Sequence, residues 1–429
     1  MAQDDPEAPG LVRQFWRALG PGLVTGAADD DPSGIATYSQ AGAQFGYGLT
    51  WTMFLTLPFM TAIQIISAWI GWQTRQGLAR NLAKQFPQPV MLSLVALLVV
   101  ANTINIAADL AAMGEALRLV IGGPQVFYAL VFGGICLVLE IAIPYHAYAG
   151  LLKFIALVLL VYVAAAFSVH IPWGEVARAT FLPQITLDRD MILTVVAVFG
   201  TTISPYLFFW QASQEAEESR LSHRIRQVKT PKRVHFRHIA GDTWVGMIFS
   251  NLVAFFIILT TAATLHTAGI TKVDTAAQAA EALRPIAGNL AFFLFSLGII
   301  GTGLLAVPVL AGSAAYAAAE TFGLRGSLEL PASRALGFYA IVGAATLGGA
   351  ALTATEIDPI KMLFWSAVIN GIAAVPIMGA MMWIVTVGEG ARKLALPMWI
   401  KVLGWLAALL MALAVGLLIW SSLKTGAPS

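Results

Sequence analysis

Apolar segments of about 18 to 25 residues recur along this chain, separated by short polar stretches, and this pattern limits the fold more than any other feature. A helix needs about 20 such residues to cross the hydrocarbon core of a membrane. Alternating β-barrel patterning is absent from the sequence, and a helix satisfies its own backbone hydrogen bonds in lipid. We therefore predict an all-α integral membrane protein with about 11 spans. They cover residues 19–45, 49–72, 90–113, 126–143, 147–170, 191–212, 241–265, 288–318, 335–352, 360–386 and 398–421.

The composition agrees with a membrane protein, because 58% of the 429 residues are hydrophobic, 11% are charged and the mean hydropathy is +0.77. The loops are too short to hold a soluble catalytic domain, and His146, His170 and His266 are scattered near span ends, so we do not expect an enzyme. The small net charge of +2 gives no reason to expect a nucleic-acid partner. The single cysteine, Cys136, falls in an apolar run and is expected to be a core thiol.

Lysine and arginine residues predict the orientation of the spans, because cytoplasmic loops of membrane proteins carry an excess of them. With the N-terminus inside, alternate loops place 18 of the 25 basic residues on the cytoplasmic side. The outside set is Arg118, Arg178, Arg189, Lys272, Arg284, Lys361 and Lys424. We therefore expect a cytoplasmic N-terminus and, with an odd number of spans, an extracellular C-terminus. Residues 1–9 are polar and acidic, so no cleavable signal peptide is expected.

The longest charged stretch, residues 220–238, lies between the sixth and seventh spans. It is typical of an ordinary cytoplasmic loop, and binding of anionic lipid headgroups is the alternative. Its histidines His223, His235 and His238 could hold a metal ion, but they lack the closing carboxylate or cysteine of a metal site. We therefore favour an ordinary cytoplasmic loop over a metal site.

The first span carries the polar sequence DPSG, residues 31–34, at its centre. Proline removes one backbone hydrogen bond and glycine tolerates unusual dihedral angles, so the helix is expected to break here. A proline kink alone would not explain Asp31, because an unpaired carboxylate in a membrane costs about 2.5 kcal/mol or more. We interpret the break as part of a substrate site. Asp29 and Asp30 are expected either to line a water-filled vestibule or to pair with a cation elsewhere.

The sixth span has a similar proline-containing interruption, Ser204 and Pro205, at a similar depth. Pro32 and Pro205 thus mark two broken helices five spans apart, so spans 1 to 5 and 6 to 10 enter the membrane from opposite sides. Such an inverted repeat brings the two breaks together near the bilayer midplane, where freed carbonyls and helix ends bind ions. The expected parts are a cytoplasmic tail (1–18), the first repeat (19–170), an extracellular loop (171–190), the second repeat (191–386), and a last helix with its tail (387–429).

The third span carries Asn102, Asn105 and Asp109, whose spacing of three and four residues puts them on one helical face. An ionisable face inside a helix bundle suggests a proton or ion path, and a structural polar network is the alternative. Glu140 in span four and Lys153 in span five lie near the same cytoplasmic side, and we expect them to form a structural pair.

At these residues the sequence resembles the NRAMP family of proton-coupled divalent metal transporters, over nearly its whole length. The similar stretches are GPGLVTGAADDDPSG in span one, NIAADLAAMG in span three, the proline-broken span six and NLVAFFIILTTAATLH in span seven. The resemblance implies a LeuT-type fold, in which five plus five helices form an inverted repeat with breaks in helices 1 and 6.

The metal-binding motifs of that family are only partly kept. The family's first-helix motif is Asp-Pro-Gly-Asn; its aspartate matches Asp31, whereas the glycine and the metal-binding asparagine become Ser33 and Gly34. In the sixth helix the family's metal-binding methionine becomes Ser204, and the histidine two residues later becomes Tyr206. One carboxylate is therefore retained, and an amide, a thioether and an imidazole are lost.

Three further positions follow from the same resemblance. The alanine whose carbonyl contacts the metal in the family becomes Thr201. The family's aspartate in span three matches Asp109, but the glutamate three residues later is Ala112. Arg334 matches an arginine of the family's proton route. If proton coupling persists, the resemblance implies that it runs from Asp31 through Asp109 and Arg334.

The remaining ligands are hard oxygen donors, namely the Asp31 carboxylate, backbone carbonyls and the hydroxyls of Ser33, Thr201 and Ser204. Without a thioether, such a set favours a hard divalent cation such as Mg²⁺ over Mn²⁺ or Fe²⁺. We therefore expect a secondary transporter of the cell membrane that moves this cation by alternating access. The cation is a substrate, no cofactor is expected, and the partners are membrane lipid and the ion itself. One chain with two repeats completes such a site, so a monomer is expected.

A small organic cation or amine is the alternative cargo, with Asp31 as its counter-ion. The aromatic residues after the second break would permit this choice, although aromatics in a membrane helix commonly serve packing or face lipid. They are Tyr206, Phe208, Phe209 and Trp210.

Overall fold

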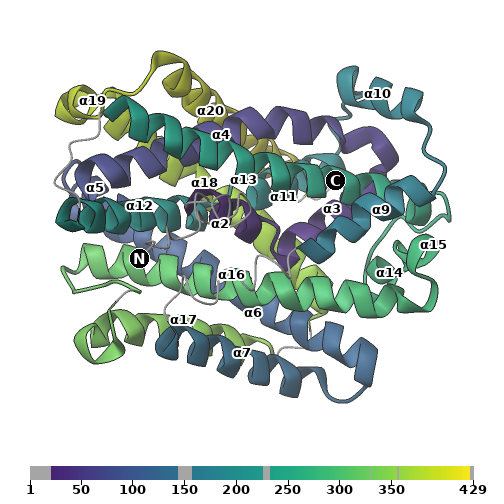
Figure 1. Ribbon diagram of the computed structural model, residues 1–429. Coiled ribbons are helices and arrows are strands. Elements are labelled where there is room, and N and C mark those ends of the chain that lie inside the picture. The colour runs from purple at the N-terminus through teal and green to yellow at the C-terminus, as the bar shows by residue number, and fades with distance from the viewer. Residues whose placement is uncertain (1–20, 144–156, 226–231, 329, 355–356, 426–429) are drawn as a thin grey trace, which may run out of the picture.

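The computed structural model describes residues 21–143, 157–225, 232–328, 330–354 and 357–425, and every regular element in these ranges is a helix. The long helices run side by side across Figure 1, with α5 and α19 at one end of the bundle and α10, α14 and α15 at the other. The second end carries residues that the charge count predicts to be extracellular, and we call it the outer end. The predicted all-α fold class is confirmed.

The helices within the predicted spans are α2 (Pro21–Asp29), α3 (Pro32–Phe45), α4 (Trp51–Thr74), α6 (Gln88–Ile121), α7 (Gln125–Ala142), α9 (Leu160–Ser168), α11 (Arg189–Thr202), α12 (Pro205–Ile225), α13 (Lys232–Thr261), α16 (Ala291–Thr321), α17 (Leu336–Leu352), α18 (Pro359–Thr386) and α20 (Met398–Thr425). Short helices α5 (Leu78–Leu82), α10 (Trp173–Phe181), α14 (Ala276–Glu281), α15 (Arg284–Ala287) and α19 (Gly388–Leu394) lie between them.

Eight helical stretches of the described residues are long and apolar enough to cross a membrane, or nine if one strongly bent pair counts as a span. The first predicted span falls short because it is divided into α2 and α3, and the ninth because α17 has only 17 residues. The fifth predicted span, 147–170, lies partly outside the described residues. In its described part helix α9 ends at Ser168, and α10 then turns away by 117° within the predicted extracellular loop.

The two halves of the first span lie in the middle of the bundle, where α2 meets α12 and α13 and α3 continues diagonally (Figure 1). Glycines permit this close approach. A Cβ on Gly26 would lie 2.3 Å from the carbonyl oxygen of Gly246 on α13, and one on Gly42 would lie 2.4 Å from that of Ile258. Helix α13 therefore supports both halves of the broken span at backbone contact.

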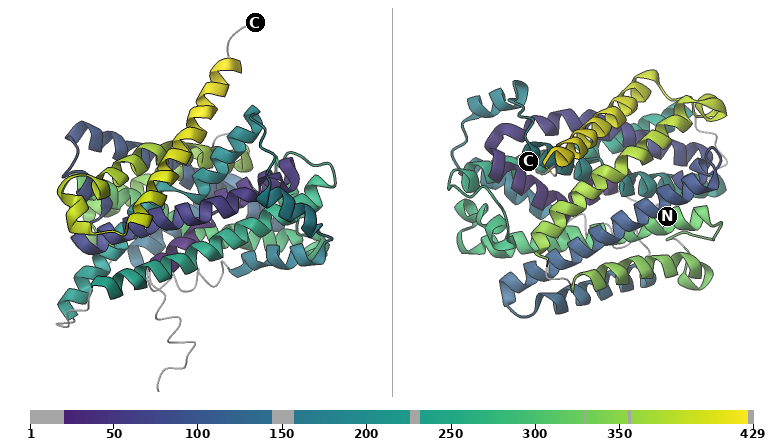
Figure 2. Two further views of the ribbon diagram at one scale, coloured as in Figure 1. Left: turned by 90° about the horizontal axis from the view of Figure 1, so that it is seen from above. Right: turned by 180° about the vertical axis from the view of Figure 1, so that it is seen from behind.

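Burial separates central helices from those that face lipid. The most apolar window of the stretch Arg189–Leu221, which contains α11 and α12, is 89% buried, against 28% for α7 and 39% for α20. Figure 2 shows α20 running obliquely along the outside of the bundle, with its C-terminal end projecting beyond the other helices. The polar residues of the broken sixth span are thus enclosed by protein on nearly every side.

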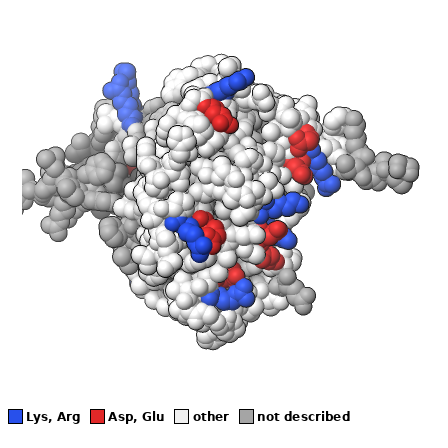
Figure 3. All heavy atoms as spheres, turned by 90° about the vertical axis from the view of Figure 1, so that its right-hand side faces the viewer, with Lys and Arg blue, Asp and Glu red and all other residues white. Residues whose placement is uncertain are grey.

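The outer end carries its charges mostly in neighbouring groups of opposite sign (Figure 3). Ion pairs between described residues at this end join Arg118 to Glu115 (2.7 Å), Arg284 to Glu281 (3.0 Å) and Lys361 to Asp274 (3.2 Å). At the opposite end the Glu320 carboxylate accepts hydrogen bonds from the backbone N–H groups of Gly77 and Arg80 and so ties α16 to α5.

Candidate functional site

The first break lies between Asp29, where α2 ends, and Pro32, where α3 begins. Asp31 caps α3: its Oδ1 accepts hydrogen bonds from the backbone N–H of Gly34 (2.8 Å) and the hydroxyl of Ser33 (2.6 Å). Pro32 takes the first helical position, which needs no N–H donor. The sequence DPSG therefore starts a new helix inside the membrane, as predicted.

The second break lies between Thr202, the last residue of α11, and Pro205, the first of α12. The Ser204 hydroxyl lies 2.7 Å from the carbonyl oxygens of both Gly200 and Thr201. It therefore donates its proton to carbonyl groups that have no N–H partner because helix α11 ends here. The Thr201 carbonyl and the Ser204 oxygen are thereby held next to each other, both buried.

Hydrogen bonds join the two breaks directly. The Tyr206 hydroxyl on α12 donates to the backbone carbonyl of Ala28 in the last turn of α2, at 2.9 Å. The hydroxyls of Ser33 and Thr201 are 3.4 Å apart, and those of Tyr38 and Thr202 are 3.2 Å apart. The prediction that the two broken helices meet is confirmed by these contacts.

Asp31 also belongs to a network from α6 and α18. The side-chain amide nitrogen of Asn105 lies 3.1 Å from Asp31 Oδ2 and 3.1 Å from Asp109 Oδ2, and its oxygen accepts a hydrogen bond from Asn370 Nδ2 at 2.8 Å. Asp31 is 2% exposed, while Asn105, Asp109 and Asn370 are completely buried. Two carboxyl groups therefore lie on either side of one neutral amide.

Oxygen is the donor atom that this site offers. Asp31, Ser33, Thr201 and Ser204 lie around the two breaks, and the described ion pairs supply no Lys or Arg to the buried carboxyl groups. Gly34 contributes only its backbone, and a Cβ there would lie 3.3 Å from the Thr201 hydroxyl. Among the described residues no group of three or more His, Cys, Asp or Glu side chains could hold a metal. A cation bound here would rest on one carboxylate, hydroxyls and carbonyls.

Asp29 and Asp30 lie on the other side of the break and face α13. The Ser250 hydroxyl lies 2.6 Å from Asp29 Oδ2 and 3.1 Å from Asp30 Oδ1, so one proton is shared between two carboxyl groups. Both residues are at most 1% exposed, and neither forms an ion pair within the described ranges. In this conformation the described contacts of both carboxyl groups go to Ser250, and the expectation that they line a water-filled vestibule or pair with a cation elsewhere stays a prediction.

The other predicted residues are placed less centrally. Arg334 is exposed on a 3-10 turn (Ala332–Arg334) before α17, whose Gly349 packs on Ile106. With about 1.5 Å of rise per helical residue, Arg334 lies roughly 20 Å along α17 from the level where Gly349 meets Ile106, which is one turn before Asp109. The proton route through Arg334 stays a prediction. Lys153 lies outside the described residues, so its pairing with the buried Glu140 also stays a prediction.

Asn102 and the predicted aromatic residues serve packing. The Asn102 amide donates to the Leu310 carbonyl and the Ser313 hydroxyl of α16, so the predicted polar face divides between a structural contact and the site. Phe208, Phe209 and Trp210 are at most 1% exposed and do not face lipid. In the basic loop, the His235 ring lies against Trp72, and the side chain of His223 lies outside the described residues.

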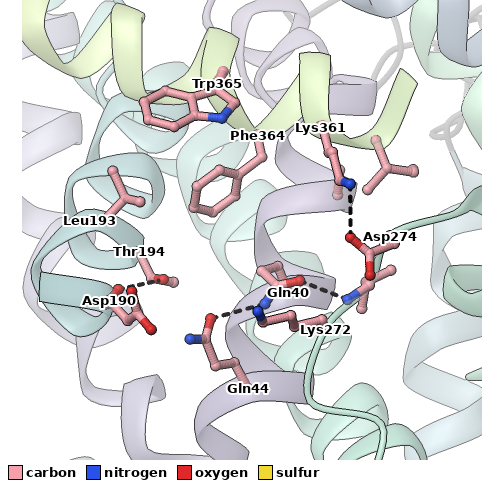
Figure 4. Close-up of a pocket in the computed structure, with 13 residues that line it drawn as sticks. Gln40, Gln44, Asp190, Leu193, Thr194, Lys272, Asp274, Lys361, Phe364 and Trp365 are labelled. Atoms are coloured by element: carbon pink, nitrogen blue, oxygen red, sulfur yellow. Dashed lines mark hydrogen bonds and ion pairs between the residues drawn. The ribbon is translucent and has the colours of Figure 1, made fainter. Parts of the chain in front are cut away.

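A pocket of about 200 Å³ lies on the outer side, between α3, α11, α18 and the segment 272–274 (Figure 4). Gln40 occupies its centre: the Oε1 atom accepts from the backbone N–H of Val273 at 2.8 Å, and the Nε2 atom donates to Gln44 and to the carbonyl of Thr271. The Lys361–Asp274 ion pair closes one edge. Gln40 thus links α3 to the outer loop above the buried site.

Two helices broken by proline that meet at a buried carboxylate form the architecture of secondary transporters. The family model for "Natural resistance-associated macrophage protein-like" proteins matches residues 22–421, and the chain belongs to this family. The predicted family is thereby confirmed.

Relatives agree with this assignment. The chain is 29% identical over 303 residues to the divalent metal cation transporter MntH of Yersinia enterocolitica, covering 68% of this chain and 69% of the relative. It is 25% identical over 412 residues to MntH of Klebsiella pneumoniae, covering 94% of each. Both similarities cover more than two thirds of this chain and of each relative.

Solved structures show the same fold. The structure of the Eremococcus coleocola manganese transporter superposes with a TM-score of 0.74 at 15% identity, covering 98% of this chain and 96% of that one. Mhp1, a nucleobase-cation-symport-1 family transporter, matches with a TM-score of 0.54 at 14% identity, covering 95% of this chain and 93% of that one. The fold prediction made from the two breaks is therefore confirmed.

Proposed function

We propose that this protein transports a divalent cation across the cell membrane by alternating access, and that Asp31 is the charged ligand. The observation that carries the proposal is the position of Asp31, which is 2% exposed, caps the second half of a broken helix and reaches the hydroxyl of Ser33, itself 3.4 Å from that of Thr201. Relatives named divalent metal cation transporters support the same cargo class.

A hard ion such as Mg²⁺ fits the donor set better than Mn²⁺ or Fe²⁺. Ser204 stands where the family has a methionine, and Tyr206 directs its hydroxyl to a carbonyl of α2. The donors left are oxygens, which suit Mg²⁺ and Ca²⁺, whereas thioether and imidazole donors favour softer transition metals. Mg²⁺ keeps several waters, so it requires few direct protein ligands.

Proton coupling is weaker in this proposal than in a transporter with a continuous chain of titratable groups. The neutral amide of Asn105 lies between Asp31 and Asp109, and an amide does not carry a proton from one carboxylate to another. A proton leaving Asp31 would need water or a movement of Asn105 to reach Asp109. Coupling through Asp109 and Arg334 is thus part of the proposal only for a conformation that differs from this one.

The proposed setting is a cell membrane, with the N-terminus in the cytoplasm and the C-terminus outside, as the distribution of basic residues supports. Lipid is the proposed surrounding partner, with the inorganic ion as substrate and no nucleic acid. One chain already contributes both broken helices to the site, so a monomer suffices for transport.

The test is isothermal titration calorimetry of the purified protein with Mg²⁺, Mn²⁺ and Ca²⁺, followed by flux into proteoliposomes for each ion that binds. Asp31→Asn is the informative variant, because asparagine caps a helix as well as aspartate, while the change removes the charge and the oxygen that accepts from Asn105. Asp188→Asn is the matched control, since Asp188 caps α11 through Met191 N–H in the same way, outside the site. We expect saturable Mg²⁺ binding in wild type and Asp188→Asn, and none in Asp31→Asn.

If none of the three ions gave a binding signal in calorimetry or a flux into proteoliposomes, the divalent-cation proposal would be overturned. Amines and other organic cations would then be screened against the Asp31 carboxylate, which is the counter-ion that such a substrate needs. Equal Mg²⁺ binding by wild type and Asp31→Asn would instead remove Asp31 from the site.

A further inference from the structure

We propose that Asn105 and Asn370 form an amide switch that turns the side-chain oxygen of Asn105 onto a cation held by Asp31. The proposal rests on the cation site proposed above and adds a ligand to it. The first observation is a buried acceptor without a donor: Asn370 Oδ1 is completely buried and has no hydrogen-bond partner in the described structure. A buried oxygen without a donor destabilises the folded state, so its presence calls for a physical reason.

In the present arrangement every donor of Asn105 points at a carboxyl group. Its Nδ2 lies 3.1 Å from both Asp31 Oδ2 and Asp109 Oδ2, which fixes its Oδ1 toward α18. Asn370 must then present its own Nδ2 to that oxygen, at 2.8 Å, and its Oδ1 is left over. The unsatisfied oxygen of Asn370 is thus a consequence of how Asp31 and Asp109 orient Asn105.

Rotation of the Asn105 amide by half a turn gives a second arrangement. The Asn105 oxygen would then face Asp31 and Asp109, and its NH₂ group would face Asn370. The Asn370 amide must turn as well, because its Nδ2 now faces Asn105, and its Oδ1 then becomes the acceptor for the Asn105 NH₂ group. An amide oxygen directed at two carboxyl groups is unfavourable by itself, but it becomes favourable when a cation lies between them. The second arrangement is therefore selected by the bound cation, which is the differential interaction that a switch needs.

The site needs such an oxygen because the break in the first span offers no side-chain amide. Gly34 has no side chain, and a Cβ at that position would lie 3.2 Å from the Tyr38 ring and 3.3 Å from the Thr201 hydroxyl. A larger side chain there would have to displace both neighbours. The amide of Asn105, already 3.1 Å from Asp31, is placed to supply the missing oxygen.

Close packing of α18 on α11 brings Asn370 to this position. A Cβ on Gly200 would lie 2.0 Å from the carbonyl oxygen of Ala367 and 2.5 Å from the backbone nitrogen of Gly371. The two helices therefore touch backbone to backbone, one residue from Thr201 on α11 and one residue from Asn370 on α18. This crossing holds Asn370 close to the second break.

Two substitutions at Asn105 separate a ligand from a structural donor. Asn105→Asp keeps the shape and an oxygen but removes the NH₂ group, whereas Asn105→Leu keeps the approximate volume and removes both. If the oxygen binds the cation, Asn105→Asp binds Mg²⁺ at least as tightly as wild type in calorimetry. Asn105→Leu then binds Mg²⁺ with a dissociation constant at least about tenfold higher than that of wild type. If Asn105 only donates to Asp31 and Asp109, Asn105→Asp is the weaker of the two, which would overturn the proposal.

A second pair of substitutions, at Asn370, tests the switch and decides the matter if the Asn105 variants do not fold. Asn370→Asp keeps an acceptor for the turned amide and removes the donor that holds the present arrangement, so its Mg²⁺ affinity should equal or exceed that of wild type. Asn370→Leu removes both and should weaken binding about threefold or more. An equal loss of Mg²⁺ affinity in Asn370→Asp and Asn370→Leu would show that Asn370 acts only as a structural hydrogen-bond donor, and it would overturn the proposed switch.

Asn251→Leu is the matched control, because Asn251 is a buried amide on α13 that donates to the Met60 sulfur instead of contacting Asp31. Its Mg²⁺ affinity should stay within twofold of wild type, and size-exclusion profiles and melting temperatures report folding for all variants. Loss of binding in Asp31→Asn together with wild-type binding in Asn105→Leu would overturn this inference and leave the proposed function intact. Failure of wild type to bind any divalent cation would overturn both.

Discussion

The Tyr206 hydroxyl donates a hydrogen bond to the backbone carbonyl of Ala28 at 2.9 Å, and so joins the second broken span to the end of the first. Ala28 lies in the last turn of α2, where carbonyl groups have no partner within the helix. Both residues are at most 1% exposed, so water does not replace this donor. The tie fixes α2 against α12 on the inner side of the site, while α3 and α11 meet through Thr201 and Thr202.

Tyr206→Phe is expected to destabilise the protein by about 1 to 3 kcal/mol, because it leaves a buried carbonyl without its donor. The measurement is the melting temperature of the purified protein in detergent. Tyr47→Phe serves as a control, since Tyr47 is a half-buried phenol on the turn Gly46–Leu49 at the outer end. Equal melting temperatures for wild type and Tyr206→Phe would show that the tie contributes nothing to stability.

Gly200→Ala is expected to prevent correct packing of α11 on α18. Its Cβ would lie 2.0 Å from the Ala367 carbonyl oxygen, a backbone atom that cannot move alone, so the helices must separate. Gly379→Ala on α18 is the matched control, because its Cβ meets nothing within 4 Å and alanine is the better helix former. We expect a lower folded yield and melting temperature for Gly200→Ala and no loss for Gly379→Ala; the reverse order would contradict a backbone-to-backbone crossing of the two helices.

Ser204→Met is expected to shift the ion preference toward softer metals. A thioether at the second break adds a soft donor, which favours Mn²⁺ or Cd²⁺ over Mg²⁺. Ser204→Leu removes the hydroxyl without adding sulfur and therefore controls for loss of the contacts to the Gly200 and Thr201 carbonyls. The measurement is the ratio of Cd²⁺ to Mg²⁺ affinities by calorimetry. A rise of about tenfold in Ser204→Met alone is expected, and the same ratio in both variants would exclude position 204 from ion selection.

Much of this architecture is predictable from the sequence because the membrane makes each signal strong. Proline at positions 32 and 205 predicts both breaks, and their separation by five spans predicts that the breaks meet. Asp31 is conspicuous because a carboxylate in an apolar run needs a reason. The hydroxyls of Ser33 and Thr201 follow from the same stretches and indeed lie 3.4 Å apart.

Other parts of the site follow only from how helices cross. Asn370 looks like any single polar residue in an apolar span, and the helix crossing at Gly200 and Gly371 is what brings it to Asn105. Ser250 is equally inconspicuous, although the neighbouring glycine at 246 could have signalled close packing of α13 on α2. A sequence shows which residues share a helical face, but the facing helix depends on backbone approach.

Gln40 is expected to hold the outer side of the transporter closed. It bonds to the carbonyl of Thr271 at 3.3 Å and to the N–H of Val273 at 2.8 Å, and both bonds must break before the outer loop moves away from α3. Gln40→Ala removes them and should raise the population of an outward-open form about fivefold or more. Gln44→Ala is the matched control, because the Gln44 side chain lines the same pocket and bonds to Gln40 within α3.

Maleimide labelling of Thr194→Cys, which lines the outer pocket, measures this opening. The background is low because the chain has one cysteine, Cys136, and it is buried. We expect the labelling rate of Thr194→Cys to rise about fivefold when Gln40→Ala is added and to change less than twofold with Gln44→Ala. Unchanged labelling in the Gln40→Ala background would mean that the Lys361–Asp274 ion pair or helix packing, and not Gln40, keeps this side closed.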